Sequence, residues 1–276
     1  MKINKKHLAL AMILLVFCWV GNVICYEKHV LKQPIFLKHY YDIPQGMNQL
    51  RLFYIEDLSS QNKITSICFP EIGQQQVNFS ESDWNNDRRY YRMKTIAINL
   101  FTGPMEVMPV QYKNKIITKA EIKFSSGKTM QVNLGKIYLY NDGLQHRDFD
   151  FKSTSSSSDG MGSIEFTAKK DVKVTGIDSS FQEETKDIFQ INVNGHAISN
   201  LDFPIELKKG DSFSIGSGFD FAKAPIKRNN VYNFVVNILT EDSAGNKGNT
   251  SCFVNTCPQS PETFDMKALK SARGRN

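Results

Sequence analysis

The residues best able to do chemistry in this chain of 276 amino acids lie around Trp84. Glu81 and Asp83 precede this ring and Asp87 follows it. A glycoside hydrolase needs two carboxyl groups held at a defined separation beside the sugar. Spacing along the sequence does not establish that separation. Hydrolysis of a polysaccharide by these acids is therefore the second of two functional hypotheses.

Aromatic residues near the same tryptophan suggest binding instead of turnover. Exposed Trp84, Tyr90 and Tyr91 would stack on a sugar or on a protein partner. The alternative is that the three rings simply pack in a core. We predict a binding surface made of these rings and the adjacent Arg88 and Arg89. The basic cluster of Arg88, Arg89, Arg92 and Lys94 favours a solvated strand and turn over a phosphate site.

The five cysteines allow one small disulfide loop. In an oxidising compartment Cys252 and Cys257 could form this bond, which would leave Cys68 single. Buried or reduced thiols are the alternative. Because the chain has no C-x-x-C motif and its histidines never cluster with cysteine, we predict no metal site. No motif predicts a cofactor.

The N-terminus has the pattern of an export signal. Lys2, Lys5 and Lys6 precede an apolar stretch at residues 8–24. As a helix this stretch would rise roughly 25 Å, just enough to cross a bilayer. Small residues in the register of a cleavage site are missing. We therefore expect an uncleaved anchor in the cell membrane, crossing once, with the bulk of the chain extracytoplasmic; a cleaved and secreted protein is the alternative.

The charge distribution argues against a nucleic-acid partner. The formal net charge is +6, and three of the lysines responsible stand in the first 25 residues. The remainder is nearly neutral and has no run of Lys or Arg interleaved with aromatic residues. An apolar share of 41% and a charged share of 22% are typical of a globular chain.

Short alternation of apolar and polar residues dominates the chain after the anchor and predicts β-strands. The clearest case is an antiparallel hairpin at residues 115–134, turning at Ser125 to Lys128. Its even-numbered side chains, from Ile116 to Leu134, are expected to face a core. Asn194 and Gly195 predict a second tight hairpin turn.

A serine-rich stretch at residues 153–162 has little to bury and predicts a linker or long loop. A flexible excursion within one larger β-domain is the alternative. The expected fold class is all-β, with two β-sandwich-like domains behind an N-terminal transmembrane helix. The predicted parts are an anchor at 1–25, a first β-domain at 26–152, the linker at 153–162, a second β-sandwich at 163–260 and a disordered basic tail at 261–276.

Residues 232–254 resemble the last strands of bacterial immunoglobulin-like surface repeats. In these repeats an alternating strand is often followed by Asp-x-x-Gly-Asn and a closing strand, as at Asp242 to Asn246. The resemblance implies a surface-exposed binding or spacer module. Independently of it, the side chain of Asp242 is suited to cap the turn, where Gly245 and Asn246 tolerate positive φ.

The first functional hypothesis is therefore a non-catalytic binding module of the bacterial cell envelope. Its expected partner is a cell-wall polymer or another envelope protein. The membrane would be contacted through residues 8–24.

Overall fold

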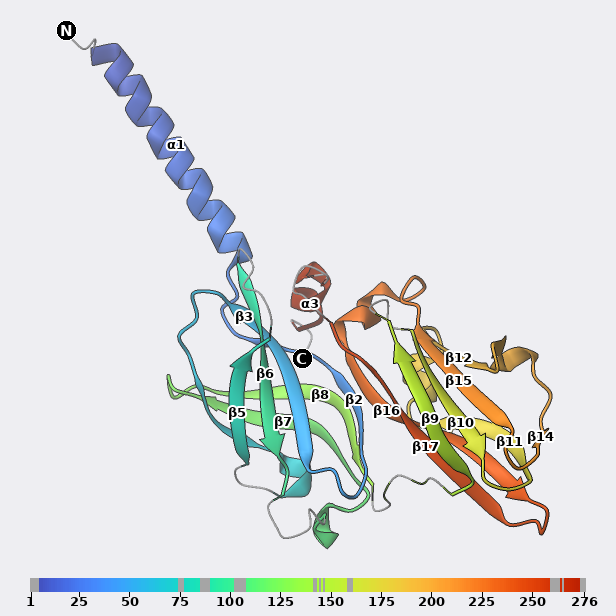
Figure 1. Ribbon diagram of the computed structural model, residues 1–276. Coiled ribbons are helices and arrows are strands. Elements are labelled where there is room, and N and C mark those ends of the chain that lie inside the picture. The colour runs from blue at the N-terminus through green and yellow to red at the C-terminus, as the bar shows by residue number, and fades with distance from the viewer. Residues whose placement is uncertain are drawn as a thin grey trace.

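The computed structural model describes residues 5–73, 77–84, 90–101, 108–140, 143, 145, 147–157, 161–258, 264 and 266–273. Most of the chain is β-strand, arranged in two lobes behind one long N-terminal helix (Figure 1). The predicted all-β class with an N-terminal helix is confirmed. The first lobe contains strands β1 to β8 and the second lobe contains strands β9 to β17.

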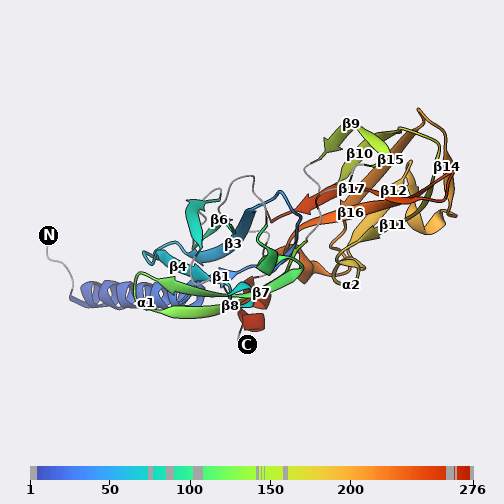
Figure 2. The ribbon, with the colours of Figure 1, turned by 90° about the horizontal axis from the view of Figure 1, so that it is seen from below.

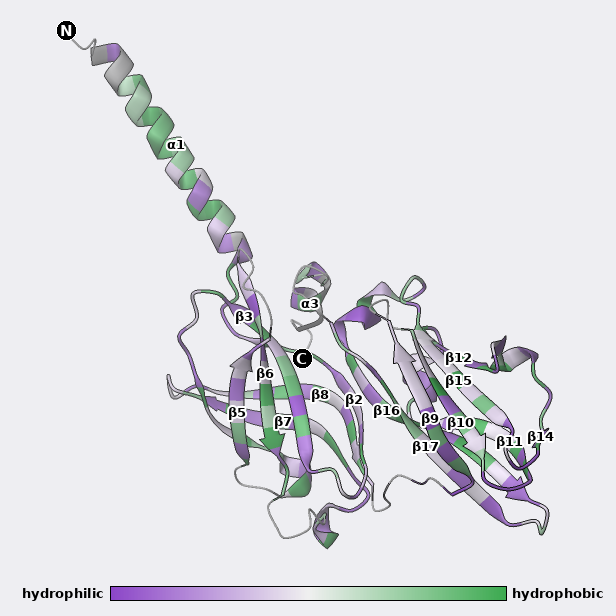
Figure 3. Cartoon of the chain, in the orientation of Figure 1, coloured by the Kyte–Doolittle hydropathy of each residue, from purple (hydrophilic) through white to green (hydrophobic). Residues whose placement is uncertain are grey.

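Helix α1 (Lys5–His29) projects from the first lobe. Its stretch Ala9–Glu27 has 19 residues, a mean hydropathy of 2.2 in its most apolar part and none of that part buried. The apolar colouring of the helix is visible in Figure 3. A helix of this length rises about 28 Å, which matches the apolar thickness of a bilayer. Length and composition therefore make α1 a candidate membrane span.

The first lobe is a sandwich around one core. One sheet has the order β1 (Ile35–Phe36), β3 (Gln49–Asp57), β6 (Tyr91–Asn99) and β5 (Asn78–Asp83). The other layer contains β2 (His39–Ile43), β8 (Thr129–Leu139), β7 (Lys115–Phe124) and β4 (Ile64–Cys68). Leu52, Ile96 and Ile137 are fully buried in the shared core.

The second lobe is also a sandwich. Its first sheet has the order β13 (His196–Ala197), β12 (Phe189–Val193), β15 (Ser212–Phe219), β10 (Gly162–Ala168) and β9 (Phe149–Ser156). Its second layer contains β14 (Ile205–Leu207), β11 (Val172–Ser179), β16 (Val231–Asp242) and β17 (Lys247–Thr256). A short helix, α2 (Gln182–Thr185), follows β11. The core between the layers is rich in phenylalanine.

Local turn chemistry agrees with the sequence predictions. Asn194 and Gly195 both have positive φ and join β12 to β13 in a tight hairpin. The carboxylate of Asp242 accepts the N–H groups of Ala244 and Asn246 and caps the turn between β16 and β17. These bonds, together with Lys170, lower the pKa of Asp242 well below its usual value.

The predicted hairpin at 115–134 forms, but one part of its face assignment is wrong. From Ala120 onward the even-numbered residues of β7 point inward, as expected. The register shifts between Ile117 and Lys119. As a result Ile116 is 41% exposed and Ile117 is buried in its place. A bulge inserts one residue and so exchanges the two faces of a strand.

Strand β2 joins the two lobes into one continuous sheet. It pairs in parallel with β8 on one side and with residues 231–233 of β16 on the other. The carboxylate of Asp42 accepts the N–H of Val235 at 2.8 Å and the hydroxyl of Ser180 at 2.6 Å. Tyr40 stacks on Tyr232 with 5.3 Å between ring centroids. The lobes therefore share hydrogen bonds and aromatic packing.

The serine-rich stretch is not a linker. Residues 153–156 belong to β9 and pair with β10, while residues 158–160 lie outside the described part of the chain. The passage between the lobes occurs earlier, after β8 ends at Leu139. The backbone N–H and C=O groups of serine and threonine form the hydrogen bonds of a sheet as well as those of other residues do. A solvated edge strand also needs few apolar side chains.

The predicted disordered tail is also wrong over its described residues. Helix α3 (Met266–Arg273) follows Phe264, which is buried in the first core. Met266 and Leu269 pack against the same core. Helix α3 therefore crosses back to the first lobe and lies beside the end of α1 in both views (Figure 1, Figure 2).

Gly135 offers a test of the contact between β8 and β2. It has φ +90, and an added Cβ would stand 2.5 Å from the carbonyl oxygen of His39. Gly127 has φ +80 but open space around it. We expect Gly127→Ala to cost about 1–2 kcal/mol of unfolding free energy, and Gly135→Ala roughly 2–3 kcal/mol more, because β2 must move. Urea unfolding in detergent, followed by circular dichroism, measures both; equal costs would contradict the close approach.

Asp42 predicts a pH dependence. Burial raises its pKa above the ordinary value of 3.8, although its hydrogen bonds act in the opposite direction. The folded protein therefore holds the proton more tightly, and ionisation removes stability as the pH rises from about 4 past the raised value. Asp42→Asn cannot ionise. The stability of the natural protein relative to this variant should fall as the pH rises from about 4 through the raised pKa. Parallel unfolding curves across that range would refute this.

Candidate functional site

The aromatic residues predicted to bind do not form one exposed surface. Trp84 follows β5 and is half-buried against the first core. Its ring meets Phe53 edge to face at 5.2 Å, and the guanidinium of Arg51 lies 5.9 Å from its centroid. Much of the surface of the Trp84 ring is therefore covered by the first core instead of being free for a partner.

The two tyrosines lie at the base of α1. Tyr91, predicted to be exposed, is buried. Tyr90 stacks on His29 at the end of α1, with 4.3 Å between ring centroids and 13° between planes. Arg88, Arg89 and Asp87 lie outside the described residues. The alternation of β6 turns Tyr91 toward the same face as Met93, which is why it is covered.

Two of the acids near Trp84, Glu81 and Asp83, belong to an ion-pair network. Lys94 bonds to Glu81, lies 3.3 Å from Glu56 and approaches Asp83 at 4.0 Å. Arg92 contacts Glu56 at 2.6 Å. Although burial opposes it, the bond to Glu81 and the charge of Glu56 raise the pKa of Lys94.

Glu56 also belongs to this ion-pair network, and the sequence analysis did not predict it. Its side chain is only 1% exposed, and a signal existed: it is an acid at the end of the apolar run Leu52 to Ile55. A buried carboxylate needs a partner, and the cations of β6 supply it. Glu81 and Asp83 share a lysine between them, which is the arrangement of a structural network instead of an acid and a base separated by a substrate.

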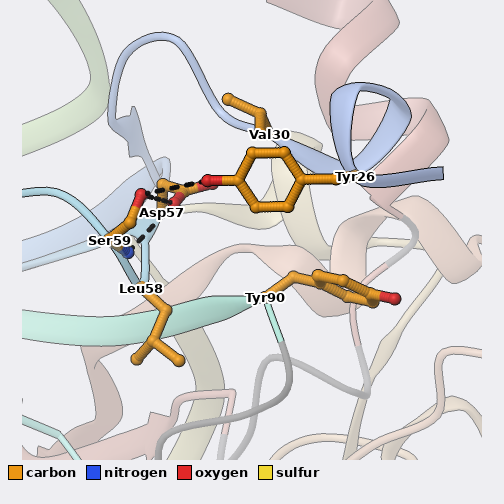
Figure 4. A pocket seen from close by; sticks show the side chains of 6 residues that line it. All are labelled: Tyr26, Val30, Asp57, Leu58, Ser59 and Tyr90. Atoms are coloured by element: carbon orange, nitrogen blue, oxygen red, sulfur yellow. Dashed lines mark hydrogen bonds between the residues drawn. The ribbon is translucent and has the colours of Figure 1, made fainter. Parts of the chain in front are cut away.

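A cavity of about 320 Å³ lies where α1 joins the body (Figure 4). Tyr26 and Val30 reach it from the helix end, and Tyr90 reaches it from the start of β6. Asp57 accepts the N–H of Leu31 at 3.1 Å and the N–H of Ser59 at 3.0 Å. Partial burial raises its pKa, but these bonds outweigh burial and the net pKa is lowered. Asp57 thus holds the chain just after α1.

Helix α3 completes this junction. The ammonium of Lys270 lies 3.5 Å from the carbonyl oxygen of His29 and 3.3 Å from the hydroxyl of Tyr91. It also lies 5.6 Å from the ring centroid of Tyr91. A cation at the carbonyl end of a helix is favourable because of the helix dipole. The predicted tyrosines therefore contact the end of α1 and α3 at this junction.

A second and larger hollow, of about 610 Å³, lies in the second lobe and is called here the β9–β17 groove. It is lined by residues 154–157 of β9 and its turn, and by residues 253–256 of β17. Phe219 and Val254 are nearly buried core residues, so they form an apolar floor. Its walls are largely hydroxyl and amide side chains, such as Thr154, Ser156 and Asn255.

One cation stands in the lining of this groove. Arg228 lies with its guanidinium 5.7 Å from the ring centroid of Phe221, which also lines the groove. The serine-rich run was the sequence signal for this place, although it was interpreted as a linker. The groove is concave, mixed in polarity and partly open, which suits it to bind rather than to enclose a reaction.

The predicted disulfide between Cys252 and Cys257 is not formed, and both thiols are free. Cys252 is buried in the second core, and burial raises its pKa to about 12. Cys257 packs against the first core. Five residues of extended chain separate their Cα atoms by about 16 Å, far more than a disulfide spans. Among the described residues, no His, Cys, Asp and Glu side chains group as a metal site.

Comparisons with known proteins do not assign the chain to a family. No protein-family model matches the chain, and no curated protein matches it significantly. Functional inference therefore rests on the geometry of the junction and the groove.

The junction provides a matched test within α3. Lys270 contacts His29 and Tyr91, whereas Lys267 is exposed on the same helix. Lys270→Met should raise the rate of amide hydrogen exchange in α3, because the helix loses its bonds to α1 and β6. Lys267→Met should leave exchange unchanged. Exchange followed by mass spectrometry on the full chain in detergent measures this, and the same rate in both variants would contradict the proposed contact.

Proposed function

We propose that this protein is a membrane-anchored binding module of the bacterial cell envelope, crossing the membrane once and acting without chemical turnover. Its β-lobes lie outside the cytoplasm. They bind an envelope component in the β9–β17 groove.

The observation that carries this proposal is the direct continuity of α1 with the body. The apolar stretch ends at Glu27, while Tyr26 and His29 already contact the first lobe. No spacer separates span and body, so the lobes would be held close to the membrane surface. Lys2, Lys5 and Lys6 precede the span, and a positive flank favours the cytoplasmic side.

The binding role is supported by where the open space lies. Glu81 and Asp83 are engaged with Lys94, and the cavity at the base of α1 is lined by residues that hold this helix. The β9–β17 groove is larger and is lined by side chains with hydrogen-bonding capacity not required for the core. Residues at its rim are therefore available to a partner.

Site-directed photo-cross-linking in living cells tests the proposal. A photo-reactive amino acid in place of Ser156, which lines the groove, should give light-dependent adducts of higher mass in the membrane fraction. The control replaces the exposed Lys209, which lies beyond the far end of β10, about 20 Å along that strand from the position opposite Ser156. Adducts from Ser156 alone are expected. No adduct from Ser156, or equal labelling from both positions, would contradict binding in the groove.

A further inference from the structure

We infer that the β9–β17 groove accepts a segment of extended polypeptide, which adds as a strand to the outer edge of β17. This inference rests on the proposed binding role of the groove. It specifies the partner as a protein or peptide chain bound mainly through its backbone.

The outer edge of β17 already makes two main-chain hydrogen bonds with residues 145 and 147. The N–H of Ser251 donates to the carbonyl of Gln145 at 2.7 Å, and the N–H of Arg147 donates to the carbonyl of Asn249 at 3.5 Å. These two bonds run antiparallel between the connection of the lobes and β17. The chain itself thus shows that this edge is straight and accessible enough for main-chain pairing.

The remaining half of the same edge is open in the groove. Because strand residues alternate, the outward bonds at 249 and 251 imply that Phe253 and Asn255 also direct their N–H and C=O groups outward. The even-numbered residues in between pair with β16. Among the described residues, none hydrogen-bonds to the outward amides of Phe253 and Asn255.

The opposite wall is a second open edge. The N–H of Ser157 bonds to the carbonyl of Met161 across the turn, so alternation directs the backbone of Thr154 and Ser156 outward. Strand β9 is last in its sheet. Both edges lie on the same side of the second lobe (Figure 1, Figure 2).

Neither open edge carries the usual protection against pairing. Natural sheets blunt their edges with lysine, proline or very short strands. The far edges of the same two layers are blunted, since β13 has two residues and β14 has three. In contrast, residues 153–157 and 252–256 contain no charge and no proline. Within the part of the chain that the structure describes, the lobe therefore leaves open the two edges that border the groove.

A peptide fits these features better than a glycan. An added strand would repeat its donors and acceptors at the spacing of Phe253 and Asn255. Its alternate side chains would point to the apolar floor at Phe219 and Val254. A sugar stacks on an open aromatic face, but the ring of Phe221 is approached by the guanidinium of Arg228.

The probe for this inference is a phage-displayed library of random linear peptides, selected on the full chain in lipid nanodiscs. An enriched peptide, made synthetically and labelled, is then titrated against two variants. Asn255→Pro removes the outward N–H without removing a bond to β16, and Asn255→Ala removes only the exposed side chain. Thermal unfolding confirms that both variants keep their fold.

We expect Asn255→Pro to weaken peptide binding roughly ten-fold or more, and Asn255→Ala to change it less than about two-fold. Bound peptide should also protect the amides of Phe253 and Asn255 from hydrogen exchange. Equal weakening by both variants, protection elsewhere, or no enriched peptide would overturn strand addition. So would protection of the groove by soluble cell-wall glycan alone. If Ser156 still cross-links in cells, only this inference fails; without cross-linking, the binding role fails first.

Discussion

The whole structure depends on the short strand β2, whose two faces pack against different lobes. Odd-numbered residues of β2 enter the first core: Tyr41 and Ile43 are buried there, and the ring of His39 accepts the N–H of Phe53. Even-numbered residues reach the second lobe, where Asp42 meets Val235 and Tyr40 stacks on Tyr232. Burial lowers the pKa of His39 to about 3, so its ring stays neutral. Separating the lobes would break the backbone pairing of β2 with β16 and expose the stacked rings of Tyr40 and Tyr232 to water.

This shared strand determines how the rest of the molecule is presented. Because β2 and β16 pair in parallel, the end of the second sandwich that contains residues 253–258 is tied to the first lobe. From there the chain returns as α3 to the base of α1, where Lys270 reaches His29. Among the described residues, the end of α1, the junction and the two lobes are thus linked through hydrogen bonds.

The two lobes use polar groups in different ways. In the first lobe, the buried Glu56 is neutralised by Arg92 and Lys94, and this network covers the sheet formed by β3, β6 and β5. In the second lobe, hydroxyl and amide side chains line a hollow between two unprotected edges. Charges that are paired internally stabilise or specify a fold, while unpaired edge amides favour association with another strand. The hollow of the second lobe therefore differs from the first lobe in having polar groups that are not paired as ions.

The sequence by itself determined the features that depend on local pattern: the apolar span, the alternation at residues 115–134 and 232–254, the Asn194-Gly195 turn and the cap at Asp242. The tertiary structure decided whatever depends on distant partners. The face change at Ile117 goes with a register shift between β7 and β8, where the carboxylate of Glu71 accepts the N–H groups of Thr118 and Lys119. Gly135 has a positive φ where β8 lies against β2, which no local pattern records. The serine-rich run became a strand because β10 pairs with it, and the tail became a helix because the first core covers Phe264. Likewise Tyr91 is buried and Cys252 stays free of Cys257, since burial and distance are properties of the assembled sheets rather than of spacing along the chain.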